Sequence, residues 1–144
     1  MMLDPYQVSG FIVGEGCFYI DVSKDPSYNC GFQSRLCLEI ELRDDDEDIL
    51  QEIKRQLGCG NVYHLEYAKY HKWKPHVKYR TSNFKDIYEK VIPFFTKYSL
   101  FGMKEKNFNL FCQAAELIKN GEHKTSEGVK KLLTLKSQIN RYGK

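Results

Sequence analysis

The 144-residue chain is long enough for one domain with a real core and too short for two ordinary ones, so we expect a single domain spanning residues 1–144. Its hydrophobic content of 42% and charged content of 28% are typical of soluble globular proteins. No run approaches the roughly eighteen apolar residues of a membrane span, and the first residues do not resemble a signal peptide. We expect a cytoplasmic or organellar (chloroplast or mitochondrial) protein that is not secreted and has no membrane partner.

The cysteines fit such a compartment. There are five, an odd number without a close pairing pattern, which argues against a secreted disulfide scaffold. Cys59, His64, His71 and His76 are conceivable zinc ligands. Their spacing matches no zinc finger or ribbon, so a zinc site is disfavoured.

The net charge of +3 is unevenly distributed along the chain. Residues 44–48 are five consecutive acids, and the rest of the chain carries 22 basic against 14 acidic residues. Residues 61–85 contain six Lys and Arg, three His and one acid, interleaved with aromatic residues. This pattern is typical of a nucleic-acid-binding surface, although an ordinary solvated hairpin would explain the charge equally well.

The first elements are a short helix and two strands. Asp4 and Pro5 suit an N-cap and a first helical position, and the helix should end near Gly14. Residues 17–23 alternate between apolar and polar, as a half-buried strand does, and a turn at 25–31 leads to a second alternating strand. In the second strand Leu36, Leu38, Ile40 and Leu42 share one face, and the other face carries Gln33, Arg35, Cys37, Glu39 and Glu41.

The acidic run should begin a helix, because acids favour the positive end of the helix dipole, and Gly58 should end it. A hairpin follows, with its turn between Tyr70 and Pro75. Asn83 then caps a helix that Pro93 should kink or end. Two further helices are predicted, about 104–119 and 125–140, and the second offers Leu132, Leu133, Leu135 and Ile139 for packing.

This order of elements predicts an α+β fold in which a four-stranded antiparallel sheet carries helices on one face. The opposite face would present polar and basic side chains that include Tyr19, Arg35, Lys78 and Arg80. A polar, partly basic, twisted sheet face could fit into a groove of DNA.

The segment VSGFIVGEGCF, residues 8–18, contains the candidate metal-binding acid and a group of small residues. Gly10 and Gly14 lie along one side of the helix, with Ser9 beside Gly10, and such small residues let a second backbone approach closely. Glu15 is placed at the negative end of the helix dipole, where a divalent cation would compensate its charge. A helix C-cap with an exposed glutamate would be the commoner explanation of GEG alone.

The segment resembles the LAGLIDADG signature, with departures at Val8, Ser9 and Val13. The resemblance extends over nearly the whole chain through the segments ELRDDDEDIL, LGCGNV, IPFF, GMKEKNF and NGEHKTSEG. It implies an αββαββα homing-endonuclease fold, with the sheet forming a DNA-binding saddle and C-terminal helices. A chain with a single signature resembles the homodimeric branch of the family, in which the first helices of two copies pack against each other. In this chain the paired residues would be Ser9, Gly10, Val13 and Gly14.

The resemblance implies that Glu15 binds Mg²⁺, with help from the Gly14 carbonyl, and that each copy cuts one strand of double-stranded DNA. Lys104 matches the family's basic residue near the water or phosphate, although Lys106 is close enough to confuse the assignment. Glu41 and Arg43 are candidates for the polar residue at the end of the second strand.

The resemblance also implies a near-palindromic DNA site. A β-strand of the saddle spans about ten base pairs, so two copies of the chain should read about twenty. The side chains expected to read bases are Tyr19, Asp21, Ser23, Gln33, Arg35, Glu39, His76, Lys78 and Arg80. Three hairpin lysines are expected to contact phosphates instead, namely Lys69, Lys72 and Lys74.

Two alternatives remain open. A maturase or a DNA-binding regulator could use the same scaffold without cutting, but such a protein would be expected to lack the acid at position 15. An unrelated α+β protein could use its sheet to bind another protein, and its binding would then depend only weakly on salt.

Overall fold

Two helix–strand–strand units build the fold, and further helices complete it. The computed structural model describes residues 1–66 and 75–142. The strands are β1 (Gly16–Lys24), β2 (Phe32–Arg43), β3 (Asn61–Leu65) and β4 (His76–Thr81). The helices are α1 (Pro5–Glu15), α2 (Glu47–Leu57), α3 (Phe84–Asp86), α4 (Ile92–Lys97), α5 (Gly102–Lys119) and α6 (Ser126–Tyr142).

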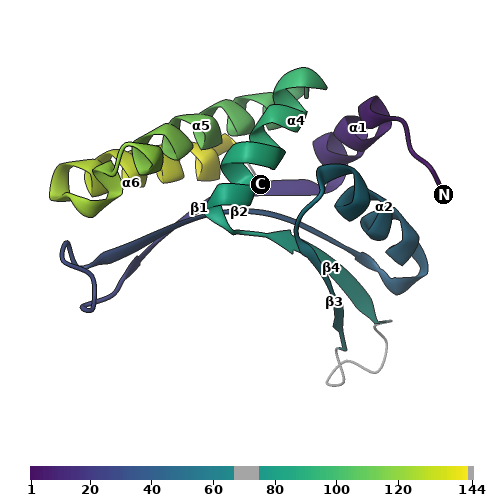
Figure 1. The fold of residues 1–144 in the computed structure, drawn as a ribbon, viewed down its shortest axis with the longest axis horizontal. Helices are drawn as coiled ribbons and strands as arrows, with labels where there is room; N and C mark the ends of the chain where they lie inside the picture. The colour runs from purple at the N-terminus through teal and green to yellow at the C-terminus, as the bar shows by residue number, and fades with distance from the viewer. Residues whose placement is uncertain (67–74, 143–144) are drawn as a thin grey trace.

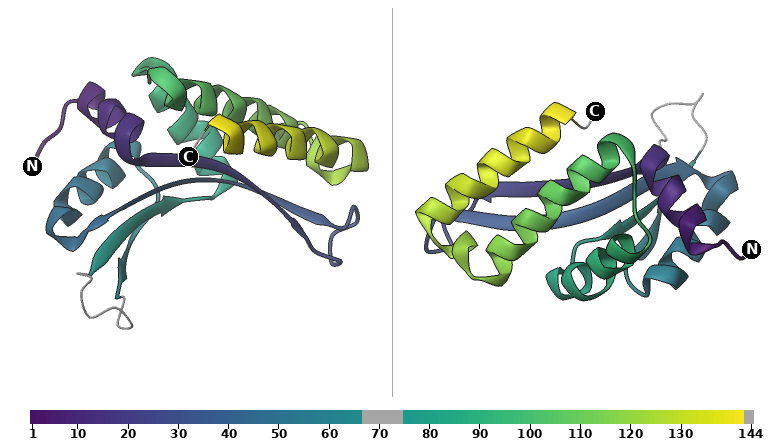
Figure 2. Two further views of the ribbon diagram at one scale, coloured as in Figure 1. Left: turned by 180° about the vertical axis from the view of Figure 1, so that it is seen from behind. Right: turned by 90° about the horizontal axis from the view of Figure 1, so that it is seen from above.

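The strands form one antiparallel sheet in the order β1-β2-β4-β3. The sheet arches, the helices cover its convex side, and its concave side faces away from them (Figure 1). Figure 2 shows the same two layers from behind and from above. The predicted α+β class, the αββαββα order and the saddle-shaped sheet are therefore confirmed.

Helix α1 begins where the sequence predicts. The Asp4 side chain accepts a hydrogen bond from the Tyr6 backbone N–H at 2.7 Å, and the Asp4 N–H donates to the Gln7 side chain at 2.8 Å. This reciprocal cap satisfies backbone donors that the first turn of a helix leaves free. Pro5, which has no N–H to satisfy, occupies the first helical position.

The acidic run also takes its predicted place. Residues Asp44–Asp46 form a 3₁₀ turn, and α2 follows it directly. Gly58 ends α2 with φ of +74°, a left-handed conformation that glycine adopts without the steric cost of a Cβ. The run is therefore explained by local structure.

The third predicted helix is irregular, as Pro93 indicated. Asn83 caps it by accepting from the Asp86 N–H at 3.1 Å. A π-helical turn, Ile87–Val91, separates α3 from α4, and Pro93 follows this turn closely in the chain. Proline cannot donate the regular helical hydrogen bond, which accounts for a break at this point.

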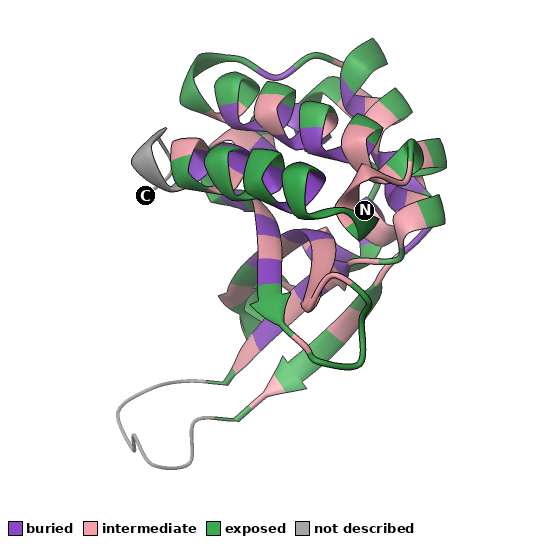
Figure 3. Ribbon diagram, turned by 90° about the vertical axis from the view of Figure 1, so that its left-hand side faces the viewer, coloured by how far each residue is buried: buried purple, intermediate pink, exposed green. Residues whose placement is uncertain are grey.

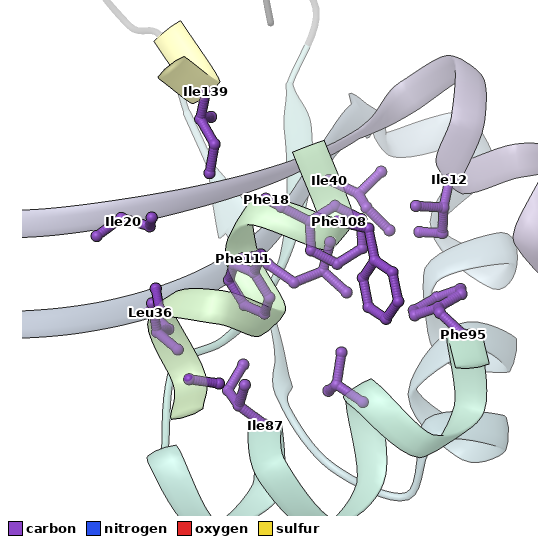
Figure 4. Packing of buried hydrophobic residues seen from close by; sticks show 14 of the residues in the cluster. Ile12, Phe18, Ile20, Leu36, Ile40, Ile87, Phe95, Phe108, Phe111 and Ile139 are labelled. Carbon is purple, nitrogen blue, oxygen red and sulfur yellow. The ribbon is translucent and has the colours of Figure 1, made fainter. Parts of the chain in front are cut away.

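The core lies between the sheet and the helices. Phe18 of β1 is at its centre, with ring centroids 5.1 Å from Phe111 and 5.4 Å from Phe108 of α5, and 5.8 Å from Phe95 of α4 (Figure 4). Buried positions recur along the helices and the strands that they cover (Figure 3). Because Phe18 follows α1 so closely, this packing also fixes the end of α1 in space.

Helix α6 packs as expected at three of its four predicted positions. Leu132, Leu135 and Ile139 are buried. The prediction for Leu133 is wrong, because its side chain is 39% exposed. Residue 133 lies next to 132 on the helix and so faces away from the surface that 132 buries.

Candidate active site and nucleic-acid interface

The acid of the signature lies at the last residue of α1. Glu15 and Gly14 are both exposed, and Gly16, which follows, is buried and begins β1. The chain leaves the helix at Gly16 in an extended conformation. The carboxylate therefore sits where the final helical carbonyls also lack helical partners, so that oxygen donors of two kinds gather at one point.

Lys104, the predicted basic partner, is brought to the same place by α5. Its ammonium group donates a hydrogen bond to the carbonyl oxygen of Gly16, the residue next to Glu15. Lys104 is half-buried, whereas Lys106 is exposed. The contact places the Lys104 ammonium next to the end of α1, where the family resemblance implies a basic residue.

One side of α1 is open. Among the described residues, nothing lies within 4 Å of a Cβ added at Gly10 or Gly14. Tyr6, one turn before Gly10, is 62% exposed, and Val13 is half-buried. Gly10 and Gly14 thus form a small-residue surface against which a second backbone could pack.

Ser9 departs from the expectation that it lies at an interface beside Gly10. It is buried within the chain, and its hydroxyl donates to the Tyr98 carbonyl at 2.5 Å. A neighbouring position on a helix points about 100° away, which turns Ser9 toward the chain's own core. Its side chain ties α1 to the end of α4 and does not share the open surface.

The predicted base-reading residues share the concave face of the sheet. The register of the strands aligns polar positions across neighbours: Cys17 with Glu39, Glu39 with Arg80, and Glu41 with Lys78. The alternation of each strand then places the predicted base-reading residues on this face: Tyr19, Asp21, Ser23, Gln33, Arg35, Glu39, His76, Lys78 and Arg80. Glu41 and Arg43, the candidates for the polar residue at the end of the second strand, share it.

Three further residues of this face were missed from sequence. Tyr63 and Asn61 of β3 are exposed and align with Lys78 and Arg80. Cys17 is exposed and lies two residues after Glu15, at the end of the face nearest the acid. The alternation within residues 61–65 could have identified the first two, since Val62 packs on the core between them.

Cross-strand ion pairs organise the centre of the concave face. Oε2 of Glu39 accepts a hydrogen bond from the Tyr19 hydroxyl at 2.9 Å and lies 3.2 Å from Nη1 of Arg80. Lys78 Nζ lies 3.7 Å from Oε1 of Glu39 and 3.9 Å from Oε1 of Glu41. Burial raises the pKa of the Tyr19 phenol, and hydrogen bonds with Cys37 and Glu39 raise it further, so Tyr19 remains a donor.

Pairs toward the ends of the face are more local. Glu41 Oε2 lies 2.9 Å from Nδ1 of His76, and Arg43 pairs with Asp45 at 2.9 Å. Ser23 donates to Asp21 at 2.8 Å within β1. Polar and charged side chains thus contact one another within the chain toward both ends of the face.

Some predicted residues lie outside the described part of the chain. These are the three hairpin lysines Lys69, Lys72 and Lys74, and also His71 of the zinc alternative. Within residues 1–66 and 75–142, no three His, Cys, Asp or Glu side chains are grouped as metal ligands would be. Cys59, His64 and His76 therefore gain no support as a zinc site from the described residues.

The donors near Glu15 suit a hard cation in part. Carboxylate and carbonyl oxygens are the ligands that Mg²⁺ prefers, and Glu15 and Gly14 supply both types in an exposed position. One carboxylate is too few for a complete site, so the remaining ligands would come from water, a phosphate or another protein copy. The residues present therefore fit part of the ligand set of such an ion.

Comparison with known proteins agrees with this geometry. Residues 8–115, which include most of α1, the whole sheet and most of α5, match the family model described as LAGLIDADG endonuclease. The chain belongs to the LAGLIDADG endonuclease family. Glu15 and Lys104 both fall within the matched residues.

Among curated relatives, a 50.9 kDa protein in ND4 intron 1 of Podospora anserina is 34% identical over 126 residues, which are 85% of this chain and 26% of the relative. A probable intron-encoded endonuclease 3 of Neurospora crassa is 29% identical over 140 residues, which are 97% of this chain and 25% of the relative. The chain thus spans about a quarter of the length of these curated relatives.

Two solved structures are similar in fold and sequence. The homing endonuclease I-TnaI matches with a TM-score of 0.83 and 28% identity, over 99% of this chain and 97% of that one. I-SmaMI, solved bound to an uncleaved DNA target with calcium ions, matches with a TM-score of 0.89 and 29% identity, over 96% of this chain and 45% of that one. A chain of this length therefore corresponds to nearly all of one solved homing endonuclease and to less than half of another.

Within the described residues, no helix combines the length and the apolar character required to traverse a bilayer.

Proposed function

We propose that this chain is one half of a site-specific endonuclease that cuts double-stranded DNA with a divalent metal, Mg²⁺, held in part by Glu15. The observation that supports this most directly is the exposed Glu15 carboxylate beside Lys104, at the edge of a polar concave sheet face. The structure of I-SmaMI bound to DNA is a close structural match, which supports DNA as the ligand of that face.

The second half would be another copy of the chain. The open surface of α1 at Gly10 and Gly14 supports such pairing, because nothing else in the described chain approaches it within 4 Å of an added Cβ. Pairing through α1 would bring two Glu15 carboxylates together and provide ligands that one copy lacks. The match to almost the whole of I-TnaI is compatible with a half of this size.

In this proposal each residue has a defined task. Glu15 would hold the cation, with the Gly14 carbonyl as a further ligand. A bound divalent cation activates water and stabilises negative charge on the scissile phosphate. Lys104, held near Glu15 by its bond to Gly16, would neutralise phosphate charge, and the concave face would position the duplex so that one strand is cut per copy.

The decisive experiment is selection of cleaved duplexes from a randomised DNA library in the presence of Mg²⁺, with a matched reaction in EDTA. We expect a near-palindromic site of about twenty base pairs and no products in EDTA. No cleaved product in Mg²⁺, together with enrichment of a site when the same library is selected for binding, would instead support the alternative, a maturase or DNA-binding regulator. Salt-insensitive binding would contradict DNA as the ligand.

Pairing has its own test in Gly10→Leu. A Cβ at this position meets nothing within 4 Å among the described residues, and the substitution removes a helical glycine, so the folded copy should be at least as stable as the wild type. On the paired surface, however, the same side chain would hold the two helices apart. Sedimentation should show a paired wild type, a largely unpaired Gly10→Leu variant, and an unaffected control, Ser137→Leu, on the exposed side of α6. A Gly10→Leu variant that still pairs would exclude this surface.

The proposal places the protein in the compartment that holds its target DNA, either the cytoplasm or an organelle. The relatives whose names record an origin in introns support an intron-encoded protein of this kind.

A further inference from the structure

Glu39 is the most enclosed of the charged side chains at the centre of the concave face. Its side chain is 18% exposed, against 35% for Glu41 and 34% for Arg80. It stands on β2, and its partners come from both neighbouring strands: Tyr19 from β1, and Lys78 and Arg80 from β4. This single carboxylate therefore connects three of the four strands on the side that faces away from the helices.

The contacts of Glu39 argue against direct reading of a base by its carboxylate. A carboxylate that recognises cytosine must direct an oxygen at the base amino group. In Glu39, Oε2 already receives the Tyr19 hydroxyl at 2.9 Å and has Nη1 of Arg80 at 3.2 Å. The group is thus directed at its own chain, which differs from the base-reading role expected from sequence.

The partners retain donors that Glu39 does not use. A guanidinium group has five N–H donors in a rigid plane, and the contact with Glu39 is made through Nη1 of Arg80. Arginine reads guanine by donating two hydrogen bonds to O6 and N7 in the major groove. An arginine that is already oriented loses less conformational freedom on binding and tolerates a misplaced base poorly.

We infer that Glu39 is a positioning residue that holds Arg80 in the orientation needed to read one guanine in each half of the DNA site. The inference rests on the proposed function and adds a specificity determinant to it. Glu39 aligns with Cys17, which is two residues after Glu15, so this guanine lies in the part of each half-site nearest the cut.

A purely electrostatic role makes a different prediction. Loss of any carboxylate makes the protein more basic and strengthens attraction to every duplex, whatever its sequence. Positioning instead affects one base pair and leaves preferences elsewhere unchanged. The two roles can be separated by a charge-matched control, Glu47→Gln, because Glu47 lies on α2 and is bonded to His64 and Gln51.

The test is a set of parallel binding selections from a randomised duplex library, with the full chain as wild type, Glu39→Gln and Glu47→Gln. The wild type and Glu47→Gln should recover the same profile, with guanine at one symmetry-related position in each half-site. In Glu39→Gln the preference for that guanine should fall about 10-fold, with the other positions unchanged. An unchanged profile in Glu39→Gln, or the same loss in Glu47→Gln, would overturn the inference.

A double variant tests whether Glu39 acts through Arg80. Arg80→Met should lose the guanine preference, and adding Glu39→Gln to it should change the profile no further. An additional loss in the double variant would mean that Glu39 acts independently of Arg80. If Glu39→Gln does not fold, Tyr19→Phe removes one bond to the same carboxylate, and it should weaken the same preference to a smaller degree. No reduction in Tyr19→Phe would then overturn the inference.

The inference and the proposed function fail in different ways. A wild type that enriches no duplex would contradict DNA recognition itself and remove the basis of the inference. A wild type that enriches a clear site, together with a Glu39→Gln variant of identical preference, would leave the proposed function intact and eliminate only the role of Glu39.

Discussion

The two ends of α1 are held in opposite ways. At the first end the helix is capped by Asp4, and the preceding Leu3 is bound by α2: its N–H donates to Glu52 at 3.0 Å and its carbonyl accepts from Gln56. At the last end Gly14 and Glu15 are exposed, with open space beyond Gly14. The helix is thus fixed by its first turn, by its buried side (Val8, Ser9 and Ile12) and by the Phe18 packing that follows it, while Gly10, Gly14 and Glu15 stay accessible.

This difference shows how one short helix can serve both stability and chemistry. The contacts that determine where α1 lies are made by residues with no place in the candidate site, apart from Lys104. Residues that would bind a cation or a second copy make few contacts within the chain. Substitutions at the first end should therefore change stability with little effect on cleavage, and substitutions at the last end should do the reverse.

The largest effect is expected for Glu15→Gln. The amide keeps the size of the side chain but loses the charge that binds a divalent cation, so cleavage of the selected site should fall by about 1,000-fold or more. Affinity for the uncut duplex should be retained, since the concave face is unaltered. Plasmid cleavage and fluorescence anisotropy measure the two quantities separately.

The melting temperature is the control for Glu15→Gln. It should match that of the wild type, because Glu15 is exposed at the helix end. A paired Glu15→Gln variant that still cut DNA at the wild-type rate would refute the assignment of the metal-binding acid.

Lys104→Met should have the next largest effect. Methionine fills similar space but cannot place a positive charge beside the Gly16 carbonyl, so the cleavage rate should fall about 100-fold. Lys106→Met, two residues along the same helix, is the matched control. Equal losses in the two variants would indicate that α5 contributes only general positive charge, whose effect should then disappear at high salt.

Glu15 could be singled out from sequence because the signals around it are local. The glycines that flank Glu15, the cap at Asp4 and the alternation in β1 all lie within residues 4–24, and the structure agrees with each. Lys104 came from the family resemblance instead, and its contact with Gly16 depends on how α5 packs on α1.

Features that depend on strand register or packing were not predictable in the same way. The alternation of β2 places Glu39 on the polar face, but only its alignment with Arg80, 41 positions along the chain, reveals the ion pair. Ser9 was assigned to the wrong side of α1 because its partner, the Tyr98 carbonyl, lies 89 positions away. Burial of Glu52 on α2 likewise required knowledge of where Leu3 lies.

At the first end of α1, Glu52→Gln should reduce stability and its dependence on pH. Hydrogen bonds from Arg55, then Gln56 and the Leu3 N–H, hold the pKa of Glu52 well below its ordinary value of about 4.3. A depressed pKa contributes stability above the ordinary value, and this contribution is lost as the pH falls toward the lower folded value. The free energy of unfolding should therefore drop less in Glu52→Gln than in the wild type between about pH 7 and pH 3.

Urea denaturation at the two pH values measures this difference for Glu52. The exposed Asp25 also has a lowered pKa, through bonds with Ser27, and Asp25→Asn is the matched control in a turn remote from α1. A pH dependence in Glu52→Gln identical to that of the wild type would show that the carboxylate does not hold Leu3 in solution. Cleavage at neutral pH should change little in either variant.

The smallest effect is expected for Asp4→Ala. Alanine removes the acceptor for the Tyr6 N–H while the Asp4 N–H can still donate to Gln7, so half of the reciprocal cap is lost. Loss of an N-cap side chain costs about 1 kcal/mol, which lowers the melting temperature of a domain of this size by about 2–4 °C. Asp4→Asn, which retains a side-chain oxygen acceptor, should recover most of that loss.

The cleavage rate should be that of the wild type in both variants, because Leu3 remains bound to α2 and Phe18 still fixes the other end. A cleavage defect in Asp4→Ala larger than its loss of stability would mean that fraying at the first turn reaches Glu15, and that the two ends of α1 are coupled.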